Sequence, residues 1–255
     1  MAVFTTKTPN DRATWLQGPD HRCSHLPAEP RRAWRLVLLG PPGVGKGTQA
    51  QILCDRLHAC HLSTGDIFRA TKSMLKRQTS PAMATAQECM ARGELVPDPT
   101  VLAVVKERRA CLSCCGGFVL DGFPRTAAQA VSLDASLRQA QVTLDAVINY
   151  QVPTDVLLNR LTGRQTCPAC NAVYHVSNCR PKIPGVCDRC KSPLSQRVDD
   201  REESLNVRIN AYNRTTAPLL DYYARRNLLI RIPAEGTPAE IFDRTMMTLV
   251  PQNQV

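Results

Sequence analysis

The chain alternates short apolar runs with stretches in which apolar residues recur at helical spacing. The apolar runs are of strand length, and they lie at residues 35–39, 60–62, 118–121, 146–150 and 228–232. The stretches between them predict helices at residues 46–57, 71–92, 99–110, 127–141, 155–162, 202–226 and 239–249. Because strands and helices alternate, we expect an α/β fold with a parallel sheet covered by helices on both faces. Residues 1–33 and 163–200 do not follow this alternation.

A glycine-rich stretch, GPPGVGKGT at residues 40–48, joins the first predicted strand to the first predicted helix. Glycines let backbone N–H groups approach phosphate oxygens closely, and the following helix adds the positive end of its dipole. Lys46 supplies a mobile charge for terminal phosphates. The stretch therefore predicts a phosphate-binding loop (P-loop), although Gly47 follows the lysine where Ser or Thr is usual and Thr48 comes one place later.

Two further stretches carry polar residues next to predicted strands. Asp121 ends the apolar run at 118–121, and in P-loop enzymes an acid at this position can hold a Mg ion or its water. The stretch STGDIFR, residues 63–69, opens another helix. Its Ser63 and Thr64 are ordinary helix caps, and their hydroxyls would serve equally well to hold a ligand.

Residues 163–200 carry two C-x-x-C pairs, Cys167 with Cys170 and Cys187 with Cys190, separated by 16 residues. This spacing predicts a closed four-thiolate zinc site, with iron as the alternative metal. Arginines flank the segment on both sides, and the sequence therefore suggests a metal-stiffened lid that closes over phosphates. These arginines are Arg160, Arg164, Arg197 and Arg208.

Composition limits the partners. The formal net charge of +10 suits a polyanionic ligand such as a nucleotide, a nucleic acid or an acidic membrane surface.

No apolar stretch approaches the length of a membrane span, and the beginning of the chain lacks the apolar core of a secretion signal. We therefore expect the twelve cysteines to be reduced, and the C-x-x-C at Cys111–Cys114 to be a loop rather than a redox motif. Residues 1–33 are interpreted as a flexible extension that matches a mitochondrial targeting segment poorly.

Taken together, the motifs resemble those of adenylate kinases with a long, zinc-bearing lid. The resemblance covers about residues 35–245 and rests on GPPGVGKGT, LSTGDIFR, GELVPD, GFVLDGFPRTAAQ, GRQTCPAC, YHV, PGVCDRC, QRVDDREE and TAPLLDYY. It implies reversible phosphoryl transfer from MgATP to AMP, giving two ADP. It also implies a P-loop kinase core at 34–250, a mobile helical AMP-binding insertion at 63–96 and a zinc lid at 163–200 with structural zinc.

The resemblance also implies roles for individual residues. ATP would be held by Gly43, Val44, Gly45, Lys46, Gly47, Thr48, Arg160, Arg164 and Gly236. AMP would be held by Thr64, Arg69, Val96, Gly122, Arg125, Gln129, Arg197 and Arg208. The catalytic set would be Lys46, Asp121, Arg125, Arg164, Arg197 and Arg208, with Asp121 ordering Mg through water. The four paired cysteines would hold the zinc.

Other functions remain open at this stage. The nearest are a GTP–AMP phosphotransferase and another nucleoside monophosphate kinase. Thr64 and Gln129 favour AMP as the acceptor, whereas the donor base is less constrained. A zinc-ribbon nucleic-acid binder fits the charge and the cysteine pairs, but it lacks interleaved aromatic residues and leaves the P-loop unexplained. We expect a cytoplasmic monomer that binds neither nucleic acid nor membrane, with a mitochondrial location as the alternative.

Overall fold

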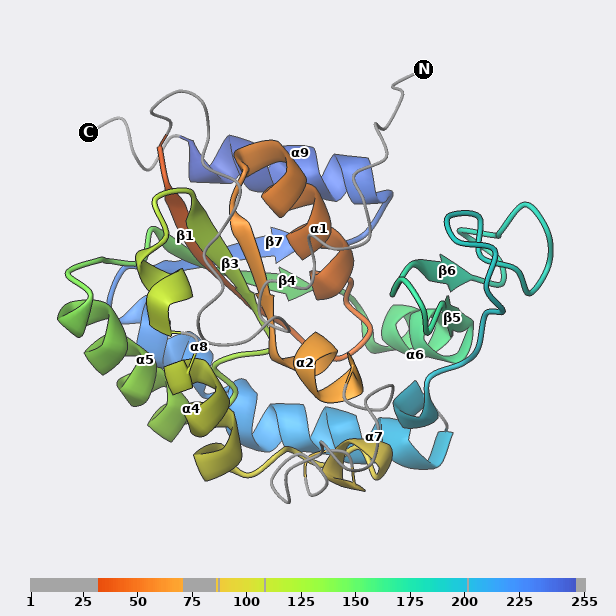
Figure 1. Cartoon of the computed structure of the whole chain (residues 1–255), viewed down its shortest axis with the longest axis horizontal. Helices are drawn as coiled ribbons and strands as arrows, with labels where there is room; N and C mark the ends of the chain where they lie inside the picture. Colours follow the sequence, from red (N-terminus) through yellow and green to blue (C-terminus); the bar gives the residue numbers. More distant parts are fainter. Residues whose placement is uncertain (1–31, 71–85, 87, 108, 201, 251–255) are drawn as a thin grey trace.

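The computed structural model describes residues 32–70, 86, 88–107, 109–200 and 202–250 (Figure 1). Its centre is a five-stranded parallel sheet with the strand order β2-β3-β1-β4-β7. The strands are β1 (Trp34–Leu39), β2 (Cys60–Ser63), β3 (Gly117–Asp121), β4 (Ala146–Gln151) and β7 (Leu229–Pro233). The predicted strands and the α/β fold class are therefore confirmed, with strand ends that differ by one residue.

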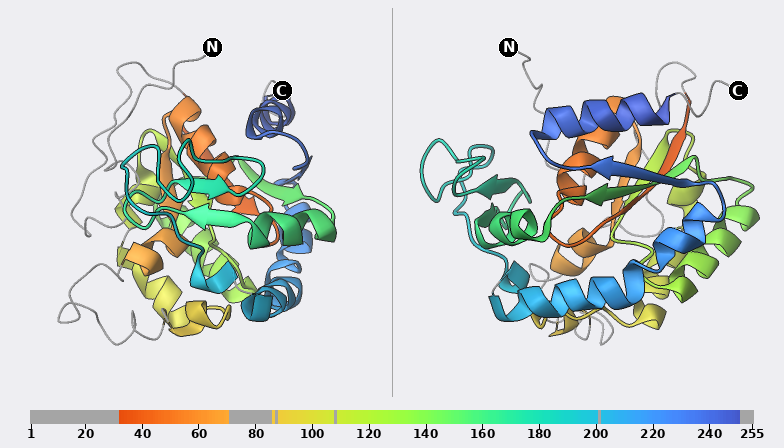
Figure 2. Two further views of the ribbon diagram at one scale, coloured as in Figure 1. Left: turned by 90° about the vertical axis from the view of Figure 1, so that its right-hand side faces the viewer. Right: turned by 180° about the vertical axis from the view of Figure 1, so that it is seen from behind.

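Helices cover both faces of this sheet (Figure 2). One face carries α1 (Lys46–Leu57) and α9 (Pro238–Leu249), and the other carries α4 (Asp98–Glu107), α5 (Ala127–Gln139) and α8 (Leu219–Ala224). Further helices are α2 (Thr64–Ala70), α6 (Thr154–Thr162), α7 (Glu202–Ala211), the short 3-10 helices at Arg109–Ser113 and Val198–Asp200, and a π-helical turn at Tyr212–Thr216. Residues 86 and 88–91 are helical as well.

The central strand explains why the strands read as unbroken apolar runs. In β1, Leu36 and Leu38 pack into the cluster under α1 and α9, whereas Val37 and Leu39 pack into the cluster under α4, α5 and α8. Successive side chains of a strand point to opposite faces, and both faces are covered here. All four residues are at most 2% exposed, so an apolar side chain is favoured at every position.

Two helix predictions need correction. The single helix predicted at 202–226 is wrong, because the chain runs through α7, the π turn and α8 instead. In the π turn, the Thr215 hydroxyl donates to the Ala211 carbonyl and the Thr216 hydroxyl donates to the Arg125 carbonyl. The helix predicted at 99–110 ends at Glu107. Of the helix predicted at 71–92, only residues 86 and 88–92 lie inside the described residues.

The region 163–200 forms a small unit of its own. Strand β5 (Arg164–Thr166) pairs antiparallel with β6 (Val173–His175). Its apolar core is separate from the two clusters of the main sheet and consists of Cys167, Ala172, Tyr174 and Cys187. Such a core is far smaller than an independent domain needs, so another source of stability is required.

The structure bears on two expectations, one about membrane-spanning helices and one about the redox state of the cysteines. Among the described residues, none of the helices combines the length and the apolarity that crossing a bilayer requires. Ten described cysteines are free, as expected, but Cys60 is disulfide-bonded, so the expectation of reduced thiols is wrong at that position. The expectation used only sequence spacing and the lack of a secretion signal, and neither reveals which sulfur atoms a fold brings together.

Candidate active site

The glycine-rich loop leaves the end of β1 and turns sharply into α1. Gly40 has φ 136°, and a Cβ atom there would lie 2.6 Å from the Tyr150 carbonyl oxygen. Gly43 has φ 84°, and its Cβ atom would lie 2.7 Å from the Leu161 side chain. Glycine is therefore required at both positions, for the backbone angle and for the close approach of neighbouring elements. The amino group of Lys46 reaches back across the loop and donates to the carbonyls of Gly40 (2.6 Å) and Pro41 (2.9 Å).

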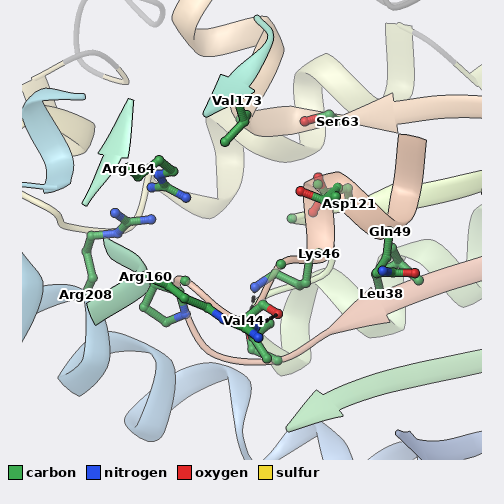
Figure 3. A pocket seen from close by; sticks show the side chains of 18 of the residues that line it. Leu38, Val44, Lys46, Gln49, Ser63, Asp121, Arg160, Arg164, Val173 and Arg208 are labelled. Atoms are coloured by element: carbon green, nitrogen blue, oxygen red, sulfur yellow. Dashed lines mark hydrogen bonds between the residues drawn. The ribbon is translucent and has the colours of Figure 1, made fainter. Parts of the chain in front are cut away.

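This loop forms the floor of a cavity of about 400 Å³, a size typical of ligand sites (Figure 3). The predicted residues that line it come from elements far apart in the sequence. They are Gly43, Val44, Gly45, Lys46, Gly47, Thr48, Asp121, Gly122, Arg125, Arg160, Arg164, Arg197, Arg208 and Gly236. The fold therefore brings five arginines and one lysine to a single concave site, which suits a ligand with several negative charges.

The crowding of positive charge alters Lys46. Burial, together with the charges of Arg125, Arg208 and Arg164, lowers the pKa of Lys46 from 10.5 to about 7, while the Asp121 carboxylate acts in the opposite direction. At neutral pH the Lys46 amine therefore binds its proton less tightly than the amine of an ordinary lysine does. Phosphate oxygens would supply the negative charge that the site lacks.

Asp121 has a neighbour that the sequence analysis did not single out. His61 Nε2 lies 3.6 Å from Asp121 Oδ2, and both side chains line the cavity. Burial alone would raise the pKa of Asp121, but the contact with His61 and the charge of Lys46 outweigh it and lower the pKa. Asp121 is therefore an ionised carboxylate at neutral pH. A signal for His61 was present, since it is a lone polar residue in the apolar run at 60–62.

Two of the predicted arginines share one buried carboxylate. Asp200 is fully buried, and its Oδ2 accepts from Arg164 Nε at 2.6 Å. Its Oδ1 accepts from Arg208 Nη1 at 2.8 Å and also from Arg164 Nη2. Figure 3 shows the guanidinium groups of Arg164 and Arg208 facing each other at the edge of the cavity. Asp200 thereby offsets the repulsion between two cations that a phosphate ligand would also draw together.

Arg160 and Arg197 are fixed by other contacts. Arg160 donates to the carbonyl of Val44 in the loop (3.1 Å) and to that of Ala234 after β7 (2.9 Å). Its guanidinium plane thus spans the side of the cavity that also contains Gly236. Arg197 Nε donates to the Thr166 hydroxyl in β5 at 3.1 Å, so this arginine is attached to the small unit at 163–200.

A second, smaller cavity adjoins the first on the side of α2 and α5. It contains Thr64, Val96, Gly122, Arg125 and Gln129 from the predicted AMP set. Thr64 Oγ1 and Arg125 Nε both donate to the Gly122 carbonyl at 2.9 Å. Arg69 belongs to α2, but its side chain lies outside the described part of the structure.

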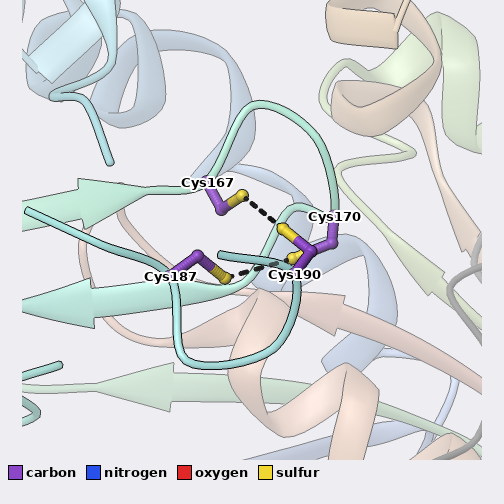
Figure 4. Close-up of side chains that lie close together, drawn as sticks. All are labelled: Cys167, Cys170, Cys187 and Cys190. Atoms are coloured by element: carbon purple, nitrogen blue, oxygen red, sulfur yellow. Dashed lines mark hydrogen bonds between the residues drawn. The ribbon is translucent and has the colours of Figure 1, made fainter. Parts of the chain in front are cut away.

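The four paired cysteines converge at the tip of the small unit (Figure 4). All four Sγ atoms lie within 4.8 Å of one another, with Cys167 to Cys190 at 3.3 Å and Cys170 to Cys187 at 3.5 Å. Sulfur atoms around tetrahedral zinc lie about 3.8 Å apart for Zn–S bonds of about 2.3 Å. The donor set therefore fits a zinc ion. Hydrogen bonds from the Cys190 backbone and the Tyr174 hydroxyl outweigh the effect of burial and lower the pKa of Cys187, which favours the thiolate that a metal needs.

A cavity that gathers guanidinium groups over a phosphate loop suits the transfer of a phosphoryl group between two nucleotides, and enzymes built in this way form the class of P-loop phosphotransferases. Comparison with known sequences narrows this class. The sequence model of the adenylate kinase family matches residues 38–228, and the chain belongs to that family.

Several curated adenylate kinases are similar over most of this chain. The one from Carboxydothermus hydrogenoformans is 49% identical over 82% of this chain and 95% of its own length. Those from Moorella thermoacetica and Acidothermus cellulolyticus are 50% and 46% identical over 81% and 84% of this chain, and over 94% and 97% of their own lengths. The chain is therefore an enzyme, a phosphotransferase that catalyses the adenylate kinase reaction between ATP and AMP.

Proposed function

We propose a specific division of labour among the cavity residues for the adenylate kinase reaction. The donor ATP is held by the P-loop, Gly43 to Thr48, with Lys46 on the transferred phosphoryl group. Arg160 packs against the donor base, and the backbone at Gly236 touches the same base. The contacts of Arg160 to Val44 and Ala234 support this assignment, because they hold its flat guanidinium group between the loop and Gly236.

AMP is assigned to the adjoining cavity. Arg69 and Arg125 contact the AMP phosphate, Gln129 reads the adenine, and Thr64, Val96 and Gly122 complete the pocket. The burial of Gln129 in the wall of this cavity supports its role, since a buried amide can discriminate between bases by hydrogen bonding. In this proposal, residues 63–96 form the mobile AMP-binding insertion of a core at 34–250.

The transferred group lies between the two nucleotides, where negative charge accumulates. Arg125, Arg164, Arg197 and Arg208 neutralise its oxygens, and the unit at 163–200 acts as a lid that excludes water. Adenylate kinases use Mg²⁺ with ATP, and the ion neutralises and orients phosphate oxygens when bound. Asp121 is proposed to hold that Mg²⁺ through water, which agrees with its lowered pKa.

The single observation that carries the proposal is the gathering of Lys46, Asp121 and the five arginines around one cavity. The lid metal is proposed to be structural zinc held by Cys167, Cys170, Cys187 and Cys190, because the small unit has too little apolar core to fold without a further constraint. We further propose that the protein acts as a cytoplasmic monomer on free nucleotides, with a mitochondrial location as the alternative. In this proposal the net charge serves nucleotide phosphates rather than nucleic acid or membrane.

A coupled assay tests the substrate assignment. ATP or GTP is offered as the donor against AMP, CMP, UMP and GMP, and diphosphate formation is measured for each pair. The expected result is the highest kcat/KM with ATP and AMP. Preference for GTP would reassign the donor site, and retention of an oligonucleotide at physiological salt without ADP formation would favour the nucleic-acid alternative.

A further inference from the structure

Asp98, the first residue of α4, contacts two side chains at the start of α5. Its Oδ1 accepts from Gln129 Nε2 at 2.7 Å, and its Oδ2 accepts from the Thr126 hydroxyl at 2.8 Å. Gln129 is 2% exposed and lines the smaller cavity beside Thr64, Gly122 and Arg125. Asp98 thus holds the side chain of Gln129, which lines the cavity proposed as the acceptor site.

The contacts of Gln129 fix which end of its amide is oxygen and which is nitrogen. The backbone N–H of Arg125 donates to Gln129 Oε1 at 2.8 Å, while the NH2 group donates to Asp98. A backbone N–H can only donate, and a carboxylate can only accept. If the amide turned over, Oε1 would face the carboxylate and NH2 would face the N–H of Arg125. Both contacts would become repulsive, so only one orientation is compatible with the protein.

This orientation leaves a defined pattern for a ligand. An amide oxygen accepts two hydrogen bonds and an amide nitrogen donates two, and the protein uses one of each. What remains is one acceptor beside one donor. A 6-amino purine matches it, because its N6–H group donates and its N1 atom accepts. A 6-oxo purine presents the reverse, with O6 accepting and N1–H donating, and would be opposed at both positions.

We propose that Asp98 is a positioning residue that determines acceptor specificity, because it locks the Gln129 amide in the orientation that pairs with a 6-amino purine and rejects a 6-oxo purine. The inference rests on the proposed role of Gln129 at the acceptor base. Asp98 acts through Gln129 and not on the nucleotide itself. Discrimination therefore depends on repulsion of the wrong base as well as on attraction of the right one.

The test compares AMP with inosine monophosphate, which carries the 6-oxo group without the additional amino group of GMP. In Asp98→Asn, the new amide can present either an oxygen or a nitrogen to Gln129, so only the N–H of Arg125 still opposes a turn of the Gln129 amide. The kcat/KM ratio of AMP to inosine monophosphate is expected to fall by about tenfold or more, mainly through the KM of the acceptor. The KM of ATP is expected to stay unchanged.

Asp55→Asn is the matched control. It makes the same substitution at a carboxylate that also accepts from a glutamine amide, Gln51 Nε2 at 3.0 Å, but that lies on α1 outside both cavities. The ratio of AMP to inosine monophosphate is expected to be that of the parent enzyme. Should Asp98→Asn fail to fold, Asp98→Ala removes the same constraint, and the same fall in the ratio is expected.

Two outcomes would overturn the inference. An unchanged ratio in the Asp98 variant, or an equal loss with both nucleotides, would reduce Asp98 to a structural residue. Gln129→Ala separates this failure from a failure of the proposed function. If Gln129→Ala leaves the kcat/KM for AMP unchanged, the assignment of Gln129 is wrong and the inference about Asp98 falls with it. If Gln129→Ala lowers that value while Asp98→Asn keeps the ratio, only the inference about Asp98 fails.

Discussion

At the scale of single residues, Lys46 combines the strongest constraints in the site. It is fixed by two backbone carbonyls of its own loop, surrounded by three arginines, and buried enough to lower its pKa to about 7. An amine held in this way is costly in the free protein, because the charged form lacks solvent and the Asp121 carboxylate only partly offsets the charges of three arginines. It gains both counter-charge and direct partners when phosphate oxygens occupy the cavity.

Lys46→Met is expected to remove phosphoryl transfer while the fold is retained. Methionine keeps much of the length and the apolar stem of lysine but cannot neutralise charge on the transferred group. We expect kcat to fall by about 10³-fold, the scale for loss of a key electrostatic contact. Steady-state kinetics measure the loss, and an unchanged circular dichroism spectrum serves as the control. Undiminished ADP production would contradict the role given to Lys46.

The same residue predicts proton uptake when nucleotide binds. With a pKa of about 7 in the free protein, Lys46 is mostly neutral at pH 8. The negative charge of phosphate raises this pKa, so ATP binding at pH 8 is expected to take up nearly one proton. Calorimetry in buffers of different ionisation enthalpy measures this number. Lys46→Met is expected to abolish the uptake, and identical heats in all buffers for the parent protein would contradict the prediction.

The lowered pKa of Lys46 also makes the free energy of unfolding depend on pH. Unfolding returns Lys46 from a pKa of about 7 to the ordinary value of 10.5. Between these two pH values the unfolded chain therefore binds the extra proton. The contribution of Lys46 to the free energy of unfolding thus rises with pH from about 7 to 10.5 and is smallest below pH 7.

At the scale of elements, short local motifs could be predicted from the sequence, whereas contacts between elements could not. The P-loop and the paired cysteines are short motifs whose spacing carries their chemistry, so the sequence predicted both. The contacts of His61 with Asp121 and of Asp98 with Gln129 join residues more than 30 positions apart. Asp98 also contacts Thr126, which is 28 positions away. The spacing of apolar residues along the sequence carries no information about such contacts.

The π turn between α7 and α8 shows the same limit. Helical spacing continues from 202 to 226, and the sequence therefore predicted one helix. The Thr216 hydroxyl instead donates to the Arg125 carbonyl, 91 positions away in the sequence, and the Thr215 hydroxyl donates within the turn. Single-turn π segments are often found at functional sites, and this one adjoins the loop that carries Arg125.

The cysteine unit predicts how the protein responds to metal removal. Because its apolar core is small and its four sulfur atoms converge, a strong chelator is expected to lower the Tm while ADP formation at low temperature persists. Cys187→Ser is expected to lower the Tm in the same way. Cys179→Ser changes an exposed cysteine outside the four and provides the control with unchanged metal content. Metal analysis that finds no zinc in the purified parent protein would contradict the proposed zinc site.

At the scale of the whole molecule, Asp200 connects the proposed lid to the core. It accepts from Arg164 at the start of β5 and from Arg208 in α7, and it is fully buried. Removing one partner of a buried ionic group leaves the others without compensation. The position of the unit at 163–200 relative to the sheet therefore depends on this carboxylate.

Asp200→Asn is expected to lower the free energy of unfolding by about 2–4 kcal/mol, because two mostly buried guanidinium groups lose their shared counter-charge. Denaturant titration measures the change. Asp243→Asn makes the same substitution at an exposed position of α9 and is expected to have an effect within about 0.5 kcal/mol. Equal stability of the two variants would show that the Asp200 pairs contribute little.

The separate core of the unit at 163–200 has a consequence for protein engineering. Because none of its members belongs to the two clusters of the main sheet, its sequence can diverge without disturbing the register of the strands. A graft that replaces it with a metal-free equivalent would have to keep Arg164 and Arg197, which line the cavity, and the contacts of Asp200. Heat tolerance could thereby be tuned in the metal-binding part of the unit while the residues that line the cavity are retained.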